Sequence, residues 1–329
     1  MYTYTFCGKN HNMKKLFYIK NPELFQGERR LTKNKKYFEG WYFKNTNSEN
    51  GISFIPGINI EGKNKKAFIQ VITKDSSYFV NYDIKNFQFN SNPFCINIAN
   101  NYFSKNYIHI DIKDKTQNLN IYGDIKYTND KNINTNNLNP NIMGPFSYMP
   151  FMECNHAILS MQNNANGSIC VNNNKINFKN DIGYIEKDWG CSFPKTYIWC
   201  QGNNFLKSNV SFMLSIANIP FKIFKFRGII CVLIIDDKEY RFATYNNTKL
   251  VEYEVKGKSL NITLKKGEYY LNIKSIYNEG HKLSAPVKGK MEKDILETIT
   301  ANITVTLKKD NDIIFSGTSI NCGLEIVKK

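Results

Sequence analysis

The chain has 329 residues, of which 42% are hydrophobic and 14% aromatic, and this apolar content excludes a wholly disordered protein. Its formal net charge is +16, yet only Arg29, Arg30, Arg227 and Arg241 among the 44 basic residues are arginine. Because base and phosphate recognition favour the forked arginine side chain, the composition argues against nucleic-acid binding.

The N-terminal region predicts no secretory signal. Residues 1–12 are polar and aromatic, and the apolar run Leu16 to Ile19 is too short for a signal core. The longest apolar run, Ile229 to Ile235, is far shorter than the roughly 20 residues that a membrane-spanning helix needs. We therefore expect a cytoplasmic protein, with Met1 and Met13 as alternative starts.

The dominant sequence period is two, which predicts strands. In the first half, strand-like runs occur at residues 53–55, 67–72, 78–82, 107–112 and 119–123, with turn-forming residues between them. The second half repeats this style at residues 209–217, 228–235, 239–245, 249–255, 259–264, 269–276 and 301–307. Strands at this spacing without a long amphipathic helix indicate an all-β sandwich or barrel.

Two polar stretches interrupt this rhythm: residues 129–141, which predict a long loop, and residues 162–180, a second polar break. The segments Tyr37 to Trp41 and Tyr184 to Trp189 each place an aromatic residue, a glutamate and a tryptophan in order, which suggests an internal duplication. We therefore expect an N-terminal extension over residues 1–30, a first antiparallel β-barrel over 31–175 and a second over 176–329.

The first candidate site is the segment Tyr37 to Lys44. On a strand, Glu39, Trp41 and Phe43 share one face. A carboxylate beside an indole on an inward face is poorly hydrated, which raises its pKa. The alternative is a charge at a strand edge beside core aromatic residues.

The second candidate site is the segment Met143 to His156, where Glu153 and Asn155 would point to one side of a strand and Cys154 and His156 to the other. His156 is the one histidine of four in a dense apolar context, which makes it a candidate acid–base group. The alternative is a hydrogen-bonded histidine of the core.

The third candidate site comprises residues 183–194 and 199–205. Glu186 and Asp188 are two positions apart and therefore face the same side of a strand. Two like charges so close raise the pKa of one of them, which suits a general acid. The alternative is a surface strand neutralised by Lys187.

No spacing predicts a cofactor. The eight cysteines form no C-x-x-C pair, and no H-x-H or H-E-x-x-H spacing occurs, so we expect neither disulfides nor a metal site. The G-x-S-x-G elbow, the P-loop and the dinucleotide glycine pattern are also missing from the sequence, so nothing indicates serine-hydrolase, nucleotide or nicotinamide chemistry.

The three segments resemble those of tocopherol cyclase-like proteins, most specifically at residues 37–44, 150–156 and 183–190. The resemblance continues through Phe193-Pro194, through Trp199 with Gln201 and Asn203, and through residues 314–317 and 323–325, so that it covers about residues 20–327. It implies two lipocalin-like barrels with few or short helices, related to proteins that act on isoprenoid or polyketide chains.

The resemblance also implies a reaction. In the cyclases an acid protonates the prenyl double bond of a phytyl-quinol, and the phenol oxygen traps the tertiary cation without redox change or metal. Many of them carry an amide where this chain has Asp188, so Glu186 is the expected acid. Indole faces would stabilise the cation, each by about 1–2 kcal/mol when desolvated.

We therefore expect an isomerase- or lyase-type cyclase that acts on a prenylated quinol or a similar apolar isoprenoid, or alternatively a non-enzymatic carrier of a hydrophobic ligand. Glu186 would be the acid, and Asp188, Glu39 and His156 would orient it or the substrate hydroxyl. The expected substrate-binding residues are Trp41, Tyr42, Glu153, Tyr184, Trp189, Trp199, Gln201 and Asn203.

Both barrels are expected to meet at one pocket, surrounded by Trp41, His156, Glu186 and Trp199 and closed on one side by the segment Pro140 to Pro150. Sites for small apolar ligands often lie between domains. The positive charge would additionally bring the opening to the periphery of an anionic membrane, where apolar substrates reside.

Overall fold

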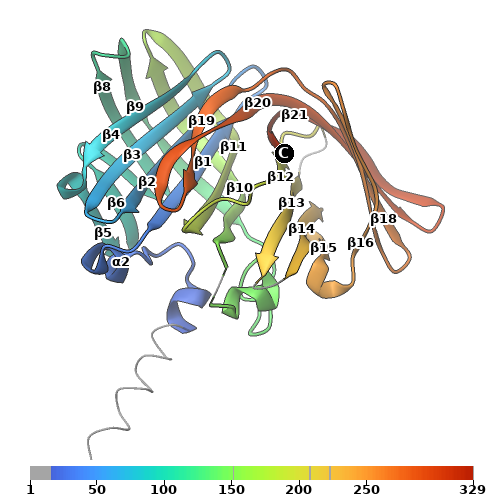
Figure 1. The fold of residues 1–329 in the computed structure, drawn as a ribbon. Helices are drawn as coiled ribbons and strands as arrows, with labels where there is room; N and C mark the ends of the chain where they lie inside the picture. The colour runs from blue at the N-terminus through green and yellow to red at the C-terminus, as the bar shows by residue number, and fades with distance from the viewer. Residues whose placement is uncertain (1–15, 151, 207–208, 222–223, 329) are drawn as a thin grey trace, which may run out of the picture.

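The computed structural model describes residues 16–328 except 151, 207–208 and 222–223. The alternative starts Met1 and Met13 and the thiol of Cys7 lie outside the described residues. The chain folds into two large antiparallel sheets that lie side by side, as the blue-to-green and yellow-to-red halves of Figure 1 show. The predicted all-β class is confirmed.

Helical structure is short throughout the described part of the chain. It comprises residues 16–20, α2 (Glu28–Lys33) and the single turns η1 (Ile84–Asn86), η2 (Gly144–Tyr148) and η3 (Thr244–Asn246). Among the residues described, no helix has the length and apolar character needed to cross a bilayer.

The first sheet curls into a nearly closed barrel with the strand order β4-β3-β2-β1-β11-β10-β9-β8-β7-β6-β5. Its strands are β1 (Tyr37–Thr46), β2 (Gly51–Glu61), β3 (Asn64–Thr73), β4 (Ser77–Asp83), β5 (Phe87–Ser91), β6 (Phe94–Ile98), β7 (Asn101–Ser104), β8 (Tyr107–Asp114), β9 (Leu119–Lys131), β10 (Cys154–Val171) and β11 (Asn174–Gly190).

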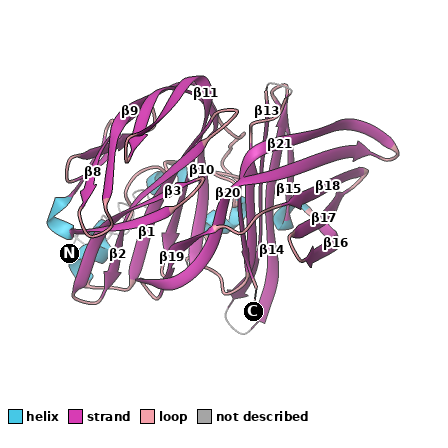
Figure 2. Ribbon diagram, turned by 90° about the horizontal axis from the view of Figure 1, so that it is seen from above, coloured by secondary structure: helices cyan, strands magenta, loops and turns pink. Residues whose placement is uncertain are grey.

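The second sheet is more open (Figure 2) and has the order β15-β14-β13-β12-β21-β20-β18-β17-β16, with β19 paired to β20. Its strands are β12 (Tyr197–Gly202), β13 (Val210–Phe221), β14 (Phe224–Ile235), β15 (Lys238–Ala243), β16 (Lys249–Lys256), β17 (Ser259–Lys266), β18 (Tyr269–Ile276), β19 (His281–Val287), β20 (Lys290–Lys309) and β21 (Asp312–Val327).

The two segments that suggested a duplication are neighbours in one sheet. β1 and β11 pair antiparallel with Trp41 opposite Lys187 and Tyr42 opposite Glu186. The change from the first sheet to the second therefore comes between Gly190 and Tyr197 instead of near residue 175. The Tyr184 segment ends the first sheet and does not open the second.

The polar stretch at residues 162–180, which breaks the strand rhythm in the sequence, is a strand pair. β10 and β11 remain paired through most of it and turn at Asn172 and Asn173, both with positive φ. Polar residues here extend a hairpin whose end is exposed, so they mark solvent contact instead of a chain break. The loop predicted over residues 129–141 is correct beyond Lys131, where β9 ends.

Apolar side chains form three buried clusters: one inside each sheet and one between the sheets. Because strand residues alternate in direction, β1 sends Trp41 and Phe43 into the first barrel and Tyr42 toward the second sheet. Every residue of β1 is buried for this reason. The interface between the sheets is thus a second core, and it contains the polar groups described next.

Candidate active site

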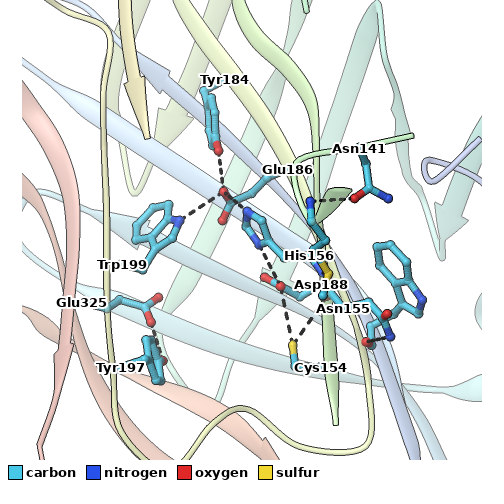
Figure 3. Close-up of polar contacts among 12 residues, drawn as sticks. Asn141, Cys154, Asn155, His156, Tyr184, Glu186, Asp188, Tyr197, Trp199 and Glu325 are labelled. Atoms are coloured by element: carbon cyan, nitrogen blue, oxygen red, sulfur yellow. Dashed lines mark hydrogen bonds and ion pairs between the residues drawn. The ribbon is translucent and has the colours of Figure 1, made fainter. Parts of the chain in front are cut away.

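Four strands contribute one face each to a polar cluster between the sheets (Figure 3). Directly paired residues share a face, so His156 of β10 lies beside Asp188 of β11. In the second sheet, Trp199 of β12 is paired with Glu325 of β21. The cluster is therefore positioned by two separate strand pairs, one in each sheet.

His156 lies between two carboxylates. Its Nδ1 is 3.0 Å from Asp188 Oδ1, and its Nε2 is 3.4 Å from Glu186 Oε2. Burial alone would lower the pKa of His156, but the negative charges of Asp188 and Glu186 outweigh it and raise the pKa to about 9. Near neutral pH the ring is therefore an imidazolium held between the two acids.

Glu186 is only 4% exposed, and this burial, together with the charge of Asp188, raises its pKa to about 7. His156 and two hydrogen bonds oppose the shift: Tyr184 Oη donates to Glu186 Oε2 at 2.5 Å and Trp199 Nε1 donates to the same oxygen at 3.2 Å. These donors converge on Oε2, which leaves Oε1 to carry the proton of the neutral acid. Glu186 is therefore neutral in a large fraction of molecules near pH 7.

The cluster forms one wall of a cavity of about 120 Å³. Apart from His156, Glu186, Asp188 and Glu325, its lining is mostly apolar and includes Met143, Phe146, Met152, Phe193, Pro194, Tyr197, Trp199, Ala217, Ile219, Phe226 and Ile230. Met143 and Phe146, from the segment that was expected to close one side, both line the cavity, and Met143 Sδ accepts a hydrogen bond from His156 N at 3.1 Å. Phe146 of this segment stacks on Phe226 of the second sheet.

A smaller cavity of about 60 Å³ lies on the other side of the carboxylates. Both cavities are lined by Glu186, Asp188, Phe193 and Glu325. The second one is completed by residues of both sheets, which include Phe38, Tyr42, Phe68, Leu283, Pro286 and Ile295. Phe193 contacts the rings of Phe38 and Tyr197 edge-on, with centroid distances of 5.3 and 6.0 Å.

The carboxyls that the sequence analysis missed are Glu297 and Glu325, which are opposite each other on β20 and β21. Tyr42 Oη donates to Glu297 Oε1 at 2.6 Å, and Tyr197 Oη donates to Glu325 Oε2 at 2.5 Å. Burial raises the pKa of Glu325 to about 7 and, together with the charge of Glu325, the pKa of Glu297 well above its usual range. Glu325 belonged to a matching tail segment, but only the strand pairing shows that it faces the site.

Glu39 and Trp41 do not belong to the site, contrary to expectation. The opposite face of β1 carries them into the first barrel, where Glu39 Oε1 is 2.5 Å from Lys187 Nζ and both side chains are fully buried. Trp41 donates from Nε1 to Glu23 O at 2.8 Å, and Lys187 Nζ lies 4.7 Å from the centre of its ring. Lys187 neutralises a buried carboxylate here, not a surface strand.

Of the other expected binding residues, one lines a cavity and the rest make contacts elsewhere in the described structure. Tyr42 lines the smaller cavity, and Tyr184 supports Glu186. Trp189 packs on the first core, and Asn203 holds the backbone oxygens of Met161 and Gly183. Gln201 accepts a hydrogen bond from the buried Lys44, and Glu153 contributes its backbone oxygen to Cys191 N.

Three ligand-type atoms of His156, Glu186 and Asp188 lie within 4.8 Å of one another. A metal ion would need one ring nitrogen and both carboxylates directed at a single point. Here each ring nitrogen faces a different carboxylate, which suits a protonated imidazole. The arrangement fits a proton better than a metal ion.

The comparisons with known proteins give a family and a fold. Residues 112–327 match the family described as tocopherol cyclase-like, and no curated protein gives a significant match. The structure of CghA with Sch210972 superposes with a TM-score of 0.55 at 7% identity, over 89% of each chain. An AttH protein from Nitrosomonas europaea gives 0.50 at 10% identity, over 89% of this chain and 93% of that one. Kievitone hydratase from Nectria haematococca gives 0.45 at 11% identity, over 92% and 93%.

Proposed function

The chain belongs to the tocopherol cyclase-like family, and from this premise we propose that it is an enzyme that isomerises an apolar, oxygen-bearing small molecule by acid catalysis. The proposed reaction closes a ring between a phenol oxygen and a prenyl double bond. The observation that carries the proposal is Glu186, a buried carboxyl with a pKa of about 7 at the wall of an apolar cavity. Such a group is neutral often enough near pH 7 to act as a general acid.

The first step transfers the Glu186 proton to one carbon of the double bond, so that a C–H bond forms, the π bond breaks and the other carbon becomes a tertiary cation. Trp199 is only 6% exposed and lines the cavity, so its ring contributes a desolvated π surface near that cation. Gly323 makes room for this ring, because a Cβ there would lie 2.7 Å from it.

In the second step the phenol oxygen bonds to the cation and releases its proton to a carboxylate that faces the cavity. The proton given up by Glu186 is thereby balanced, and the product has the mass of the substrate. The His156–Asp188 pair keeps a positive charge beside Glu186 after it has donated its proton, which stabilises the resulting carboxylate.

The cavity volume indicates which part of the substrate is bound most closely. Cavities of about 150 Å³ hold a benzene-sized ligand, and the cavity here measures about 120 Å³. We therefore expect the reacting ring to occupy it, with the chain directed past Phe146 and Phe226, whose rings are 5.6 Å apart.

The test is incubation of the purified protein with prenylated hydroquinones, followed by chromatography and mass spectrometry. We expect a product of unchanged mass and altered retention. The variant Glu186→Gln keeps a hydrogen-bond acceptor for Tyr184 and Trp199 but has no acidic proton, so its rate should fall by about 100-fold or more. The matched control is Glu252→Gln on β16, at an exposed position outside both cavities.

Full turnover by Glu186→Gln would contradict the role of the acid. Native mass spectrometry separates the enzyme from the carrier that the sequence also allowed. A protein that is purified with an apolar ligand and returns every offered quinol unchanged would be a carrier, and the proposed reaction would be wrong.

A further inference from the structure

Glu297 and Glu325 form a pair of carboxyls that the proposed proton donation does not use. They lie directly opposite each other on β20 and β21, with exposed fractions of 0% and 9%. Two carboxylates this close cannot both be ionised in a buried site, so the pair holds a proton between them. Glu297 Oε2 is buried and has no hydrogen-bond partner within the described part of the chain, so it is the oxygen available to carry the proton that the pair shares.

The pair is asymmetric with respect to the cavities. Glu325 lines both of them, whereas Glu297 lines neither and lies behind it. Tyr42 fixes Glu297, and Ser53 Oγ in turn donates to Tyr42 Oη at 3.0 Å. Tyr197 fixes Glu325 through one oxygen, Oε2. Glu325 is therefore held in place as a carboxylate. Its oxygens can still accept a further hydrogen bond from a ligand.

The ligand function that this carboxylate recognises is a hydrogen-bond donor. We propose that Glu325, supported by Glu297, is the subsite that binds the hydroxyl group of an apolar phenol or hydroquinone. An ionised carboxylate accepts hydrogen bonds only, and a charge-assisted O–H···O⁻ bond is among the stronger ones. A ligand in the larger cavity would thus contact two carboxyl groups. Glu186 would donate the proton, and Glu325 would bind the hydroxyl group.

The inference rests on the proposed function for the class of ligand, and it completes the proton balance. When the phenol oxygen bonds to the cation, its O–H bond breaks and the proton passes to Glu325. Each turnover therefore moves one proton from Glu186 to Glu325 and leaves the ligand isomerised. The site is ready again once Glu325 has released this proton and Glu186 has regained one.

The experiment measures binding and needs no turnover. Isothermal titration calorimetry compares 4-butylphenol with 4-butylanisole, which has the same ring and chain but no O–H donor. We expect the wild-type chain to bind the phenol at least about tenfold more tightly, as one hydrogen bond to a charged group allows. Glu325→Gln should reduce this ratio to about threefold or less, while the matched control Glu252→Gln, at an exposed position outside both cavities, should retain it.

A second variant covers the case in which Glu325→Gln does not fold. Tyr197→Phe removes the hydroxyl that donates to Glu325 Oε2 and helps to keep this carboxyl ionised, so at pH 7 the preference for the phenol should fall at least about twofold. Equal affinities in the wild type, a ratio retained by Glu325→Gln, or a ratio unchanged by Tyr197→Phe would each overturn the inference. A Glu325-dependent preference in a protein that converts no prenyl-quinol would instead overturn the cyclisation and leave the subsite intact.

Discussion

At the scale of single residues, the chemistry depends on a few charges buried between the sheets. Glu186, Glu297 and Glu325 are at most 9% exposed, as is Lys44, whose pKa burial lowers to about 8. More acidic than basic side chains are buried between the sheets. The carboxyl groups there therefore keep their protons at a pH at which exposed carboxyl groups are ionised. This surplus explains why several groups titrate near neutral pH together.

The pH dependence of the rate follows from Glu186. The reaction needs its neutral form, and its pKa is raised to about 7 by burial and by the charge of Asp188. We expect kcat/KM to fall about tenfold per pH unit above roughly pH 7, as Glu186 ionises, and to fall also at lower pH, as Glu325 becomes protonated and no longer accepts the phenol proton. A pH–rate profile between pH 5 and 9 checks this, and a rate that rises through pH 7 would show that an ionised group acts instead.

At this scale the sequence predicted the site correctly where the alternation of side chains along one strand decides which residues share a face. Glu186 and Asp188 lie on one face because they are two residues apart, and both line the cavity. It failed for Glu39, because nothing local shows which face of β1 meets the second sheet. It missed Glu325, because its position depends on pairing with β12 and β20, which are far away in the chain.

At the scale of elements, residues 22–26, which precede α2 and β1, close the first barrel. Lys187 Nζ donates to Pro22 O at 2.7 Å and to Leu24 O at 2.6 Å, and Gln26 N donates to Glu39 Oε1 at 2.9 Å. These contacts join the segment to β1 and β11. They also fill the barrel interior with an ion pair and aromatic rings, so the ligand cavity lies between the sheets.

The buried ion pair predicts a large effect on stability. Lys187→Met leaves Glu39 ionised and uncompensated inside the barrel, so the free energy of unfolding should fall by about 3–5 kcal/mol. Denaturant unfolding measures it. The double variant with Glu39→Gln should recover part of this loss, since it removes the unpaired charge as well.

The control for this prediction is Lys85→Met, which removes an exposed lysine whose Nζ is 3.8 Å from Asp83. Its effect should stay within about 0.5 kcal/mol. If Lys187→Met were as mild as this control, the ion pair would not matter to the fold.

A substitution in the segment between β11 and β12 should change the size of the ligand that the protein binds. Phe193 lies there and lines both cavities, so Phe193→Ala should join them into one longer space. We expect this variant to bind 4-alkylphenols with longer chains than the wild type does, measured by calorimetry over the homologous series. Phe79→Ala removes a half-buried ring stacked on Phe68 and provides the control; an equal shift in both variants would contradict the role of Phe193.

At the scale of the whole molecule, the strand pattern predicted the all-β class, and the structure confirms it. The strand-like runs of the second half overlap strands of the second sheet, although the run 239–245 extends past β15 into η3 and the run 209–217 begins one residue before β13. The predicted runs left out the short strands β5, β6 and β7 of the first sheet, and β12, β19 and β21 of the second. The continuity of β10 with β11 was also missed, because asparagines interrupt the strand rhythm there. Periodicity detects which residues face a core, but it does not detect paired strand ends that extend into solvent.

The buried protons also predict how stability depends on pH. The pKa of Glu186 and that of Glu325 are raised to about 7, and the pKa of His156 to about 9. Each group binds its proton more tightly in the folded state, so its contribution is lost as pH rises through these values. We expect the Tm to fall by at least about 4 °C between pH 6 and pH 9 in scanning calorimetry. A Tm that rises over this range would contradict the assignment of these protons.

The position of β21 has a consequence for how the protein is made. β21, the last of the described strands, lies in the middle of the second sheet, paired with β12 on one side and β20 on the other. During synthesis the first barrel can close once the ribosome has released Gly190, because its partner strands are then complete. The second sheet must instead wait, with one edge of β12 and one edge of β20 unpaired, until β21 has emerged. The site therefore forms only after β21 has been made, and a chain cut before Asp312 would keep a folded first barrel with an open, aggregation-prone sheet attached to it.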